Sequence, residues 1–135
     1  MKIKSLIMPT IFCLYLAAVA LLCFLHWDNL PNITGTWMGL PKDKVVHACL
    51  FLPFIPLAYF TFRSKEGSAG RNLLIVNALL LLGTGTAYMT EVIQGSLKYR
   101  SYETTDFLSD CAGLGLGYIC ITTVLLIIMI KRKFT

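Results

Sequence analysis

Charged residues are scarce in this chain, and nearly all of them lie in connecting loops, in the terminal tails or near the ends of apolar stretches. Asp, Glu, Lys and Arg make up 14% of the 135 residues, whereas 56% are hydrophobic. Ordinary soluble domains contain about 25% charged residues, so this composition indicates an integral membrane protein. The polar connections are too short to build a core of their own, which excludes a separate soluble domain.

Patterned cysteines and a nucleic-acid-binding patch are also lacking. The five cysteines fall in or beside apolar stretches without disulfide or metal-ligand spacing, where cysteine behaves as a small hydrophobe. The formal charge is +5, but the basic residues flank apolar stretches instead of alternating with stacking aromatics, which excludes nucleic acid and favours contact with anionic lipids. Because histidine is rare and no metal-ligand motif is present, the sequence predicts no metal ion and no cofactor.

Four apolar stretches are present, each of about the 20 residues that a helix needs to cross a hydrocarbon core of about 30 Å. They are Leu6–Trp27, Val45–Phe62, Leu73–Gln94 and Phe107–Ile130. The sequence therefore predicts an all-α, polytopic membrane protein whose four transmembrane helices form a compact bundle. We expect residues 1–135 to form a single domain.

The basic residues divide unevenly between the two sides that these spans define. Eight of the twelve lie on the side of the two termini, and the positive-inside rule then places both termini in the cytoplasm. Six of the seven acidic residues lie at or near the outer face. Because polar side chains gather at the outer face, we expect a functional site there.

The second span opens with a polar group, Asp43-Lys44-Val45-Val46-His47. Residues three and four apart share a helix face, so Asp43, Lys44 and His47 can form one cluster at the outer mouth. Asp43 also suits a helix N-cap, where a carboxylate accepts free amide hydrogens. His47 lies about one turn into the span, where an imidazole needs a partner in the bundle interior.

The third span ends with Glu91 and Gln94, whose spacing places them on one helix face. An intramembrane carboxylate is costly and by default indicates a functional site. The expected partners of Glu91 are His47, Lys44 or Arg100. A structural polar contact between the second and third spans is the alternative.

Arg100, Asp106 and Asp110 lead into the fourth span. The two aspartates are four residues apart and so share a face. Asp106 also suits the positive end of the helix dipole, whereas Asp110 lies one turn deeper and is not explained in that way.

Small residues form a stripe beside these aspartates and a second stripe on the third span. The first consists of Ser109, Gly113 and Gly117, and the second of Gly83 and Ala87. Such stripes let helices approach closely, so we expect the third and fourth spans to pack there. The sequence thus predicts one polar pocket that opens to the outer face and is formed by His47, Glu91, Arg100, Asp106 and Asp110.

Three ordered motifs carry a resemblance to a known family. They are Asp-Lys-x-x-His, Glu-x-x-Gln and Arg-x5-Asp-x3-(Asn/Asp)-x2-Gly. Over residues 43–117 the chain resembles the VanZ-like family, small bacterial membrane proteins named for a member linked to teicoplanin resistance. The family positions fall here on Asp43, Lys44, His47, Glu91, Gln94, Arg100, Asp106 and Gly113. The chain departs from the family at Asp110, where Asn is common.

The resemblance implies a protein of the bacterial cytoplasmic membrane with a VanZ-like core over about residues 43–130. Two classes of function stay open. In the first, the pocket binds an anionic envelope lipid, a cell-wall precursor or a glycopeptide and alters sensitivity to teicoplanin-type antibiotics. In the second, a membrane enzyme performs acid–base chemistry on a lipid-linked or phosphorylated substrate at the outer leaflet. A homo-oligomer or a subunit of an envelope complex is a third alternative.

The candidate residues divide by role. His47, Glu91 and Asp110 are the candidates for catalysis, because imidazole and a buried carboxyl group can exchange protons near neutral pH. The candidates for ligand binding are Asp43, Lys44, Gln94, Arg100 and Asp106. Membrane lipids are the expected partners.

Overall fold

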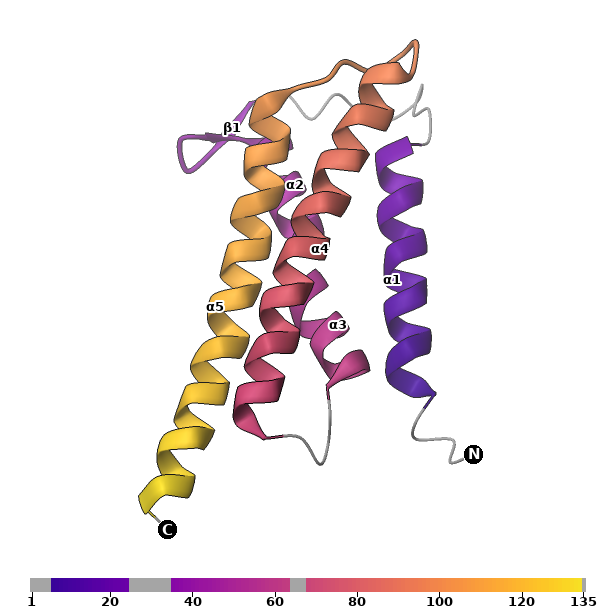
Figure 1. Ribbon diagram of the computed structural model, residues 1–135. Coiled ribbons are helices and arrows are strands. Elements are labelled where there is room, and N and C mark those ends of the chain that lie inside the picture. Colours follow the sequence, from indigo (N-terminus) through magenta and orange to yellow (C-terminus); the bar gives the residue numbers. More distant parts are fainter. Residues whose placement is uncertain (1–5, 25–34, 64–67, 135) are drawn as a thin grey trace.

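The structure is a computed structural model that describes residues 6–24, 35–63 and 68–134 (Figure 1). These ranges contain α1 (Ile7–Phe24), β1 (Thr36–Trp37), β2 (Leu40–Pro41), α2 (Lys42–Phe51), α3 (Phe54–Phe62), α4 (Ala69–Ser96) and α5 (Thr104–Phe134). Four segments, namely α1, α2 with α3, α4 and α5, are long and apolar enough to cross a membrane. The predicted all-α membrane protein with four spans is confirmed. Helices α4 and α5 extend beyond their apolar stretches at both ends.

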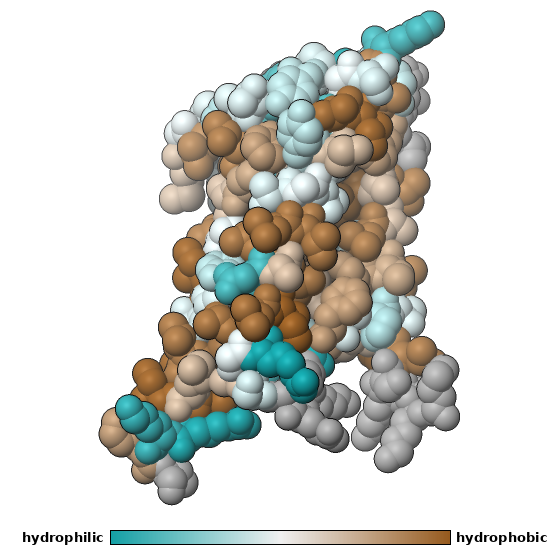
Figure 2. Space-filling view, in the orientation of Figure 1, coloured by the Kyte–Doolittle hydropathy of each residue, from teal (hydrophilic) through white to brown (hydrophobic). Residues whose placement is uncertain are grey.

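The described helices run side by side and share two common ends (Figure 1). The first turn of α1 and the last turn of α5 lie at one end, and the β1–β2 hairpin and the α4–α5 connection lie at the other. We call the latter the hairpin end. Hydrophobic residues dominate the middle of the face shown in Figure 2, and most hydrophilic surface lies towards the two ends. This distribution matches a bundle surrounded by lipid at mid-height.

The second span is broken near its middle, which the apolar pattern did not predict. Helix α2 ends at Phe51 and α3 begins at Phe54. Leu52 still donates its N–H to the Ala48 carbonyl at 3.0 Å, but Pro53 has no N–H with which to continue the helix. The break divides the span into an upper helix that carries polar residues and a lower, apolar helix.

Helix α5 lies directly against the backbone around this break. A Cβ atom built on Gly113 would lie 2.1 Å from the Ala48 carbonyl oxygen, and one on Gly117 would lie 2.6 Å from the Leu52 oxygen. Only residues without a side chain allow the two backbones to approach so closely. These two contacts fix the position of α5 along the axis of the second span.

The predicted packing of the two small-residue stripes against each other is wrong. Gly113 and Gly117 face the second span, while Gly83 of α4 contacts Phe54 and Leu114, whose Cδ2 would lie 2.7 Å from a Cβ at that glycine. Helices α4 and α5 do pack together, but at this point the large side chain of Leu114 lies against Gly83. Sequence spacing identified the small residues correctly and could not tell which neighbour each stripe faces.

A two-residue turn closes the hairpin that precedes α2. Thr36 pairs with Pro41 and Trp37 with Leu40, while Met38 and Gly39 have φ values of 51° and 84°. Positive φ at both central residues is the requirement of the turn type that best joins antiparallel strands. Pro41 is also the N-cap residue of α2, and no side chain caps this helix. The predicted N-cap role of Asp43 is therefore wrong.

Polar side chains tie α1 to the rest of the bundle. Gln94 donates from Nε2 to the Cys23 carbonyl at 2.9 Å, and the Tyr99 hydroxyl donates to the Phe24 carbonyl at 2.7 Å. Carbonyls in the last turn of a helix have no partner within the helix, so these contacts satisfy groups that would otherwise need water. The end of α1 is thus fixed to the end of α4.

We predict that residues 68 and 101, at opposite ends of α4, face opposite sides of the membrane. Single cysteines at Ser68 and Ser101, introduced into a cysteine-free background, are expected to react differently with a membrane-impermeant thiol reagent. The residue 101 thiol should react in intact cells, and the residue 68 thiol only after permeabilisation, because basic residues favour a cytoplasmic location for the termini and the α3–α4 connection. Labelling of both thiols in intact cells would contradict this orientation.

Candidate functional site

Helices α2 and α5 bring one histidine and two aspartates together near the hairpin end. His47 Nδ1 lies 3.0 Å from Asp110 Oδ1, and its Nε2 lies 3.5 Å from Asp106 Oδ2. Asp106 and Asp110 contact the same imidazole because they lie one turn apart on α5, as their spacing predicted. The imidazole is therefore held between two carboxylates.

Lys44 forms an ion-paired group above the imidazole. Its ammonium contacts Asp106 Oδ1, Glu103 Oε2 at 2.6 Å and Asp43 Oδ2 at 3.0 Å. The side chains of Asp43 and Glu103 are about half exposed, at 46% and 49%, whereas those of Lys44 and Asp106 are mostly buried. Asp106 thus has one oxygen towards Lys44 and the other towards His47, and it links the exposed group to the buried one.

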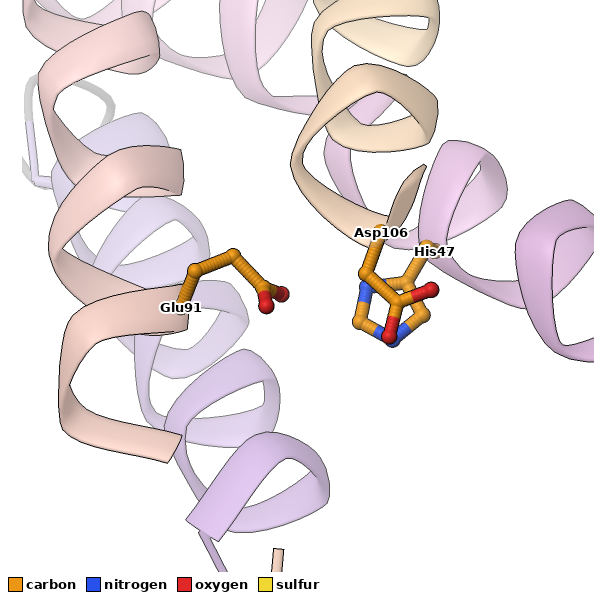
Figure 3. Close-up of side chains that lie close together, drawn as sticks. All are labelled: His47, Glu91 and Asp106. Carbon is orange, nitrogen blue, oxygen red and sulfur yellow. The ribbon is translucent and has the colours of Figure 1, made fainter. Parts of the chain in front are cut away.

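Glu91 of α4 completes the arrangement from a third helix. The residue is fully buried, and its Oε2 accepts a long hydrogen bond of 3.4 Å from the backbone N–H of Glu103. Figure 3 shows its carboxyl group directed towards His47 and Asp106. Glu91, His47 and Asp106 each offer a ligand atom, and these three atoms lie within 4.8 Å of one another. We refer to His47, Glu91, Asp106 and Asp110 as the buried cluster.

Two oxygens of the buried cluster have no hydrogen-bond partner within the part of the chain that the structure describes. They are Oε1 of Glu91 and Oδ2 of Asp110. A buried polar atom without a partner costs about 1–3 kcal/mol, and more when the group is charged. Such atoms mark a place where a proton, an ion or a ligand group can be accommodated.

The buried cluster differs from the open polar pocket that the sequence predicted. Glu91 and Asp110 are 0% exposed and His47 is 8% exposed, so these side chains form a closed group under Lys44. Arg100 is exposed and makes no side-chain hydrogen bond or ion pair with the described residues. Gln94 is buried, but its amide is directed to α1 instead of the cluster. Arg100, which was predicted to line the pocket, and Gln94, which was predicted to bind a ligand, therefore lie outside the buried cluster.

The sequence did not identify Glu103 as part of the site. Its carboxylate binds Lys44, and its backbone N–H binds Glu91. The α4–α5 connection contains two basic residues and one acidic residue, Glu103, and only the fold shows that Glu103 lies against Lys44 of α2. The prediction of no metal site was based on ligand spacing along the chain and did not consider one ligand from each of three separate helices.

An apolar groove lies beside the cluster, on the outer surface between α2 and α5. Its volume is about 430 Å³. The lining residues are Trp37, Met38, Leu40, Lys44, Val45, Ala48, Cys49, Leu52, Leu108, Ser109, Ala112 and Leu116. Lys44 alone among them carries a charge, and it also contacts Asp106 of the buried cluster. The groove and the cluster therefore meet at Lys44.

The fold and the site together define a multi-pass membrane protein with a histidine–carboxylate cluster at one end of its spans. A family model described as VanZ/LLP1 matches residues 12–128. The chain therefore belongs to the VanZ/LLP1 family. A search of curated proteins and a search of solved structures find no match.

Proposed function

We propose that the protein binds an anionic envelope lipid or a lipid-linked cell-wall precursor at the extracytoplasmic face, and that this binding lowers sensitivity to teicoplanin-type glycopeptides. The acyl chain occupies the apolar groove, and the head group lies at Lys44, next to the buried cluster. The family supports a VanZ-like membrane protein. Membership of this family supports a location in a bacterial cytoplasmic membrane, and the excess of basic residues at the termini favours a cytoplasmic position for both termini.

The observation that carries this proposal is the position of Lys44 at the junction of groove and cluster. A surface groove at the height of the spans is filled by hydrocarbon, because its lining is almost entirely apolar. The ammonium at its upper end can bind an anion in place of its exposed carboxylate partners. The exposed partners Asp43 and Glu103 can release this ammonium to a phosphate, while buried Asp106 keeps its position.

Trp37, which lines the groove, provides a direct test in detergent solution. In a Trp27→Phe background, brominated phosphatidylglycerol is expected to quench Trp37 fluorescence saturably and more strongly than brominated phosphatidylcholine. Ala112→Phe fills the groove and should reduce quenching at least several-fold. Cys120→Phe adds the same ring at an exposed position of α5 outside the groove and should leave quenching unchanged. Equal quenching in all three proteins would exclude the groove as a lipid site.

A membrane enzyme is the second candidate function, and the His47–Asp110 contact favours it. A carboxylate that accepts a hydrogen bond from Nδ1 fixes the imidazole so that Nε2 can take or give a proton, as in other histidine–carboxylate pairs. Purified protein that converts a lipid-linked phosphate would establish this function. His47→Ala should then abolish turnover and retain lipid quenching, whereas a pure binding protein shows no turnover in either form.

A further inference from the structure

We propose that His47, Glu91 and Asp106 bind a divalent transition-metal ion of the Zn²⁺ or Mn²⁺ class. Each residue comes from a different helix, α2, α4 and α5 respectively. This inference goes beyond the proposed lipid binding and does not depend on it. It rests on the geometry of the three side chains, the orientation of the imidazole and the buried Glu91 oxygen that has no hydrogen-bond partner among the described residues.

The separations suit a single ion between the three side chains. His47 Nε2 and Asp106 Oδ2 lie 3.5 Å apart, which is long for a hydrogen bond. Two ligands at about 2.1 Å from one metal ion at a tetrahedral angle lie about 3.4 Å apart. All three ligand atoms lie within 4.8 Å of one another. A modest movement of the Glu91 carboxyl group towards His47 and Asp106 would bring all three ligand atoms within reach of one ion.

Asp110 orients the imidazole for this role. Its Oδ1 lies 3.0 Å from His47 Nδ1, so a carboxylate here accepts the Nδ1 hydrogen and leaves the lone pair on Nε2. Metal-binding histidines characteristically donate their second N–H to a carboxylate or carbonyl, which sets the tautomer. Asp110 is thus a positioning residue behind the ligand.

The buried carboxylate of Glu91 supplies the independent observation. Its Oε1 has no hydrogen-bond partner among the described residues, the residue is 0% exposed, and Figure 3 shows the group directed at His47 and Asp106. An ionised carboxylate in an apolar bundle needs a counter-charge. Within the described residues, Lys44 pairs with Asp43, Glu103 and the other oxygen of Asp106 and not with Glu91, so a cation between the three groups would satisfy this oxygen.

The donor set selects the kind of ion. One imidazole nitrogen with two carboxylate oxygens suits Zn²⁺ and Mn²⁺, whereas Ca²⁺ and Mg²⁺ prefer oxygen ligands alone. Three protein ligands also leave coordination positions open. An ion held here would give this acid-rich end of the bundle a positive centre that can face a phosphate.

Electron paramagnetic resonance of bound Mn²⁺ tests the proposal on the full chain in detergent after removal of metals with a chelator. The chain has two histidines, so a His26→Gln background leaves His47 as the only imidazole. We expect one Mn²⁺ per chain, a ¹⁴N coupling from the imidazole, and displacement by Zn²⁺ but not by Mg²⁺ at equal concentration. Absence of bound ion, or of the ¹⁴N coupling, would overturn the proposal.

Variants then locate the ion. Glu91→Gln should lower Mn²⁺ affinity at least 100-fold, and Asp110→Ala about 10–100-fold, the range for loss of a partner behind a ligand. Glu103→Gln removes a carboxylate from the alternative group of Asp43, Glu103 and Asp106 and should leave affinity unchanged. Loss of binding in Glu103→Gln with retention in Glu91→Gln would place the ion at the exposed group and refute the site. Because no lipid is added, failure here is separate from failure of the lipid-quenching test.

Discussion

Replacement of Gly113 by alanine is expected to destabilise the bundle by about 3 kcal/mol or more, at the upper end of the range for overpacking. The added Cβ would lie 2.1 Å from the Ala48 carbonyl oxygen and 3.0 Å from the Leu52 nitrogen. Both atoms belong to the backbone, so no rotamer change relieves the contact, and α5 must move away from α2. Because His47 and Asp110 meet across this interface, the site should be lost with the packing.

Gly115 provides the matched control on the same helix. A Cβ at this position meets nothing within 4 Å, so Gly115→Ala should be neutral or stabilise by about 0.5–1 kcal/mol through helix propensity. Thermal unfolding of both variants in detergent, followed by circular dichroism, measures the difference. If Gly113→Ala unfolds at the same temperature as Gly115→Ala, the close approach of α5 to the α2–α3 break is incorrect.

Substitutions in the buried cluster are expected to change activity instead of stability. His47→Ala and Glu91→Gln should each return teicoplanin sensitivity of expressing cells to the level of cells without the protein. Glu91→Gln keeps the shape of the side chain and removes a buried charge, so we expect its stability to equal or exceed that of the unchanged chain. Loss of function without loss of stability is the pattern of a site residue that is unfavourable for the fold.

Thr90→Val is the matched control for Glu91→Gln. Thr90 is also buried on α4, and its hydroxyl bonds the Thr86 carbonyl of its own helix, so the isosteric change should leave resistance intact. Membrane fractionation establishes that every variant inserts to the same level. If Glu91→Gln and His47→Ala keep full resistance, the buried cluster is a structural contact between helices and our site assignment fails.

The helices were predictable because the bilayer imposes a length and a polarity that sequence shows directly. The break at Pro53 was not predicted, because a proline within an apolar run is compatible with a kinked helix as well as with two helices. The stripe of Ser109, Gly113 and Gly117 was expected to face the third span, whereas Gly113 and Gly117 face the second, and the reason is related. Spacing gives the face of one helix, whereas the neighbour of that face is set by the packing of all the spans.

The site was predictable to the extent that burial of charge is costly. His47, Glu91, Asp106 and Asp110 were identified because each stands within or beside an apolar span, and the structure brings them together. Arg100 was included because its charge lies nearby in the chain, but a long cation at a loop can remain in water. The groove was missed because its lining is ordinary apolar sequence from the β1–β2 hairpin, α2 and α5.

The contact between α2 and α5 also has a consequence for biogenesis. His47 and Asp110 are 63 positions apart in the chain, and α4 is synthesised between them. While the nascent chain emerges from the ribosome, His47 can therefore enter the bilayer before the aspartates that contact it have been synthesised. During this interval it depends on water or on the insertion machinery for polar contacts. A chain truncated before α5 would keep His47 unmatched in the membrane, a condition that exposes the chain to quality-control proteolysis.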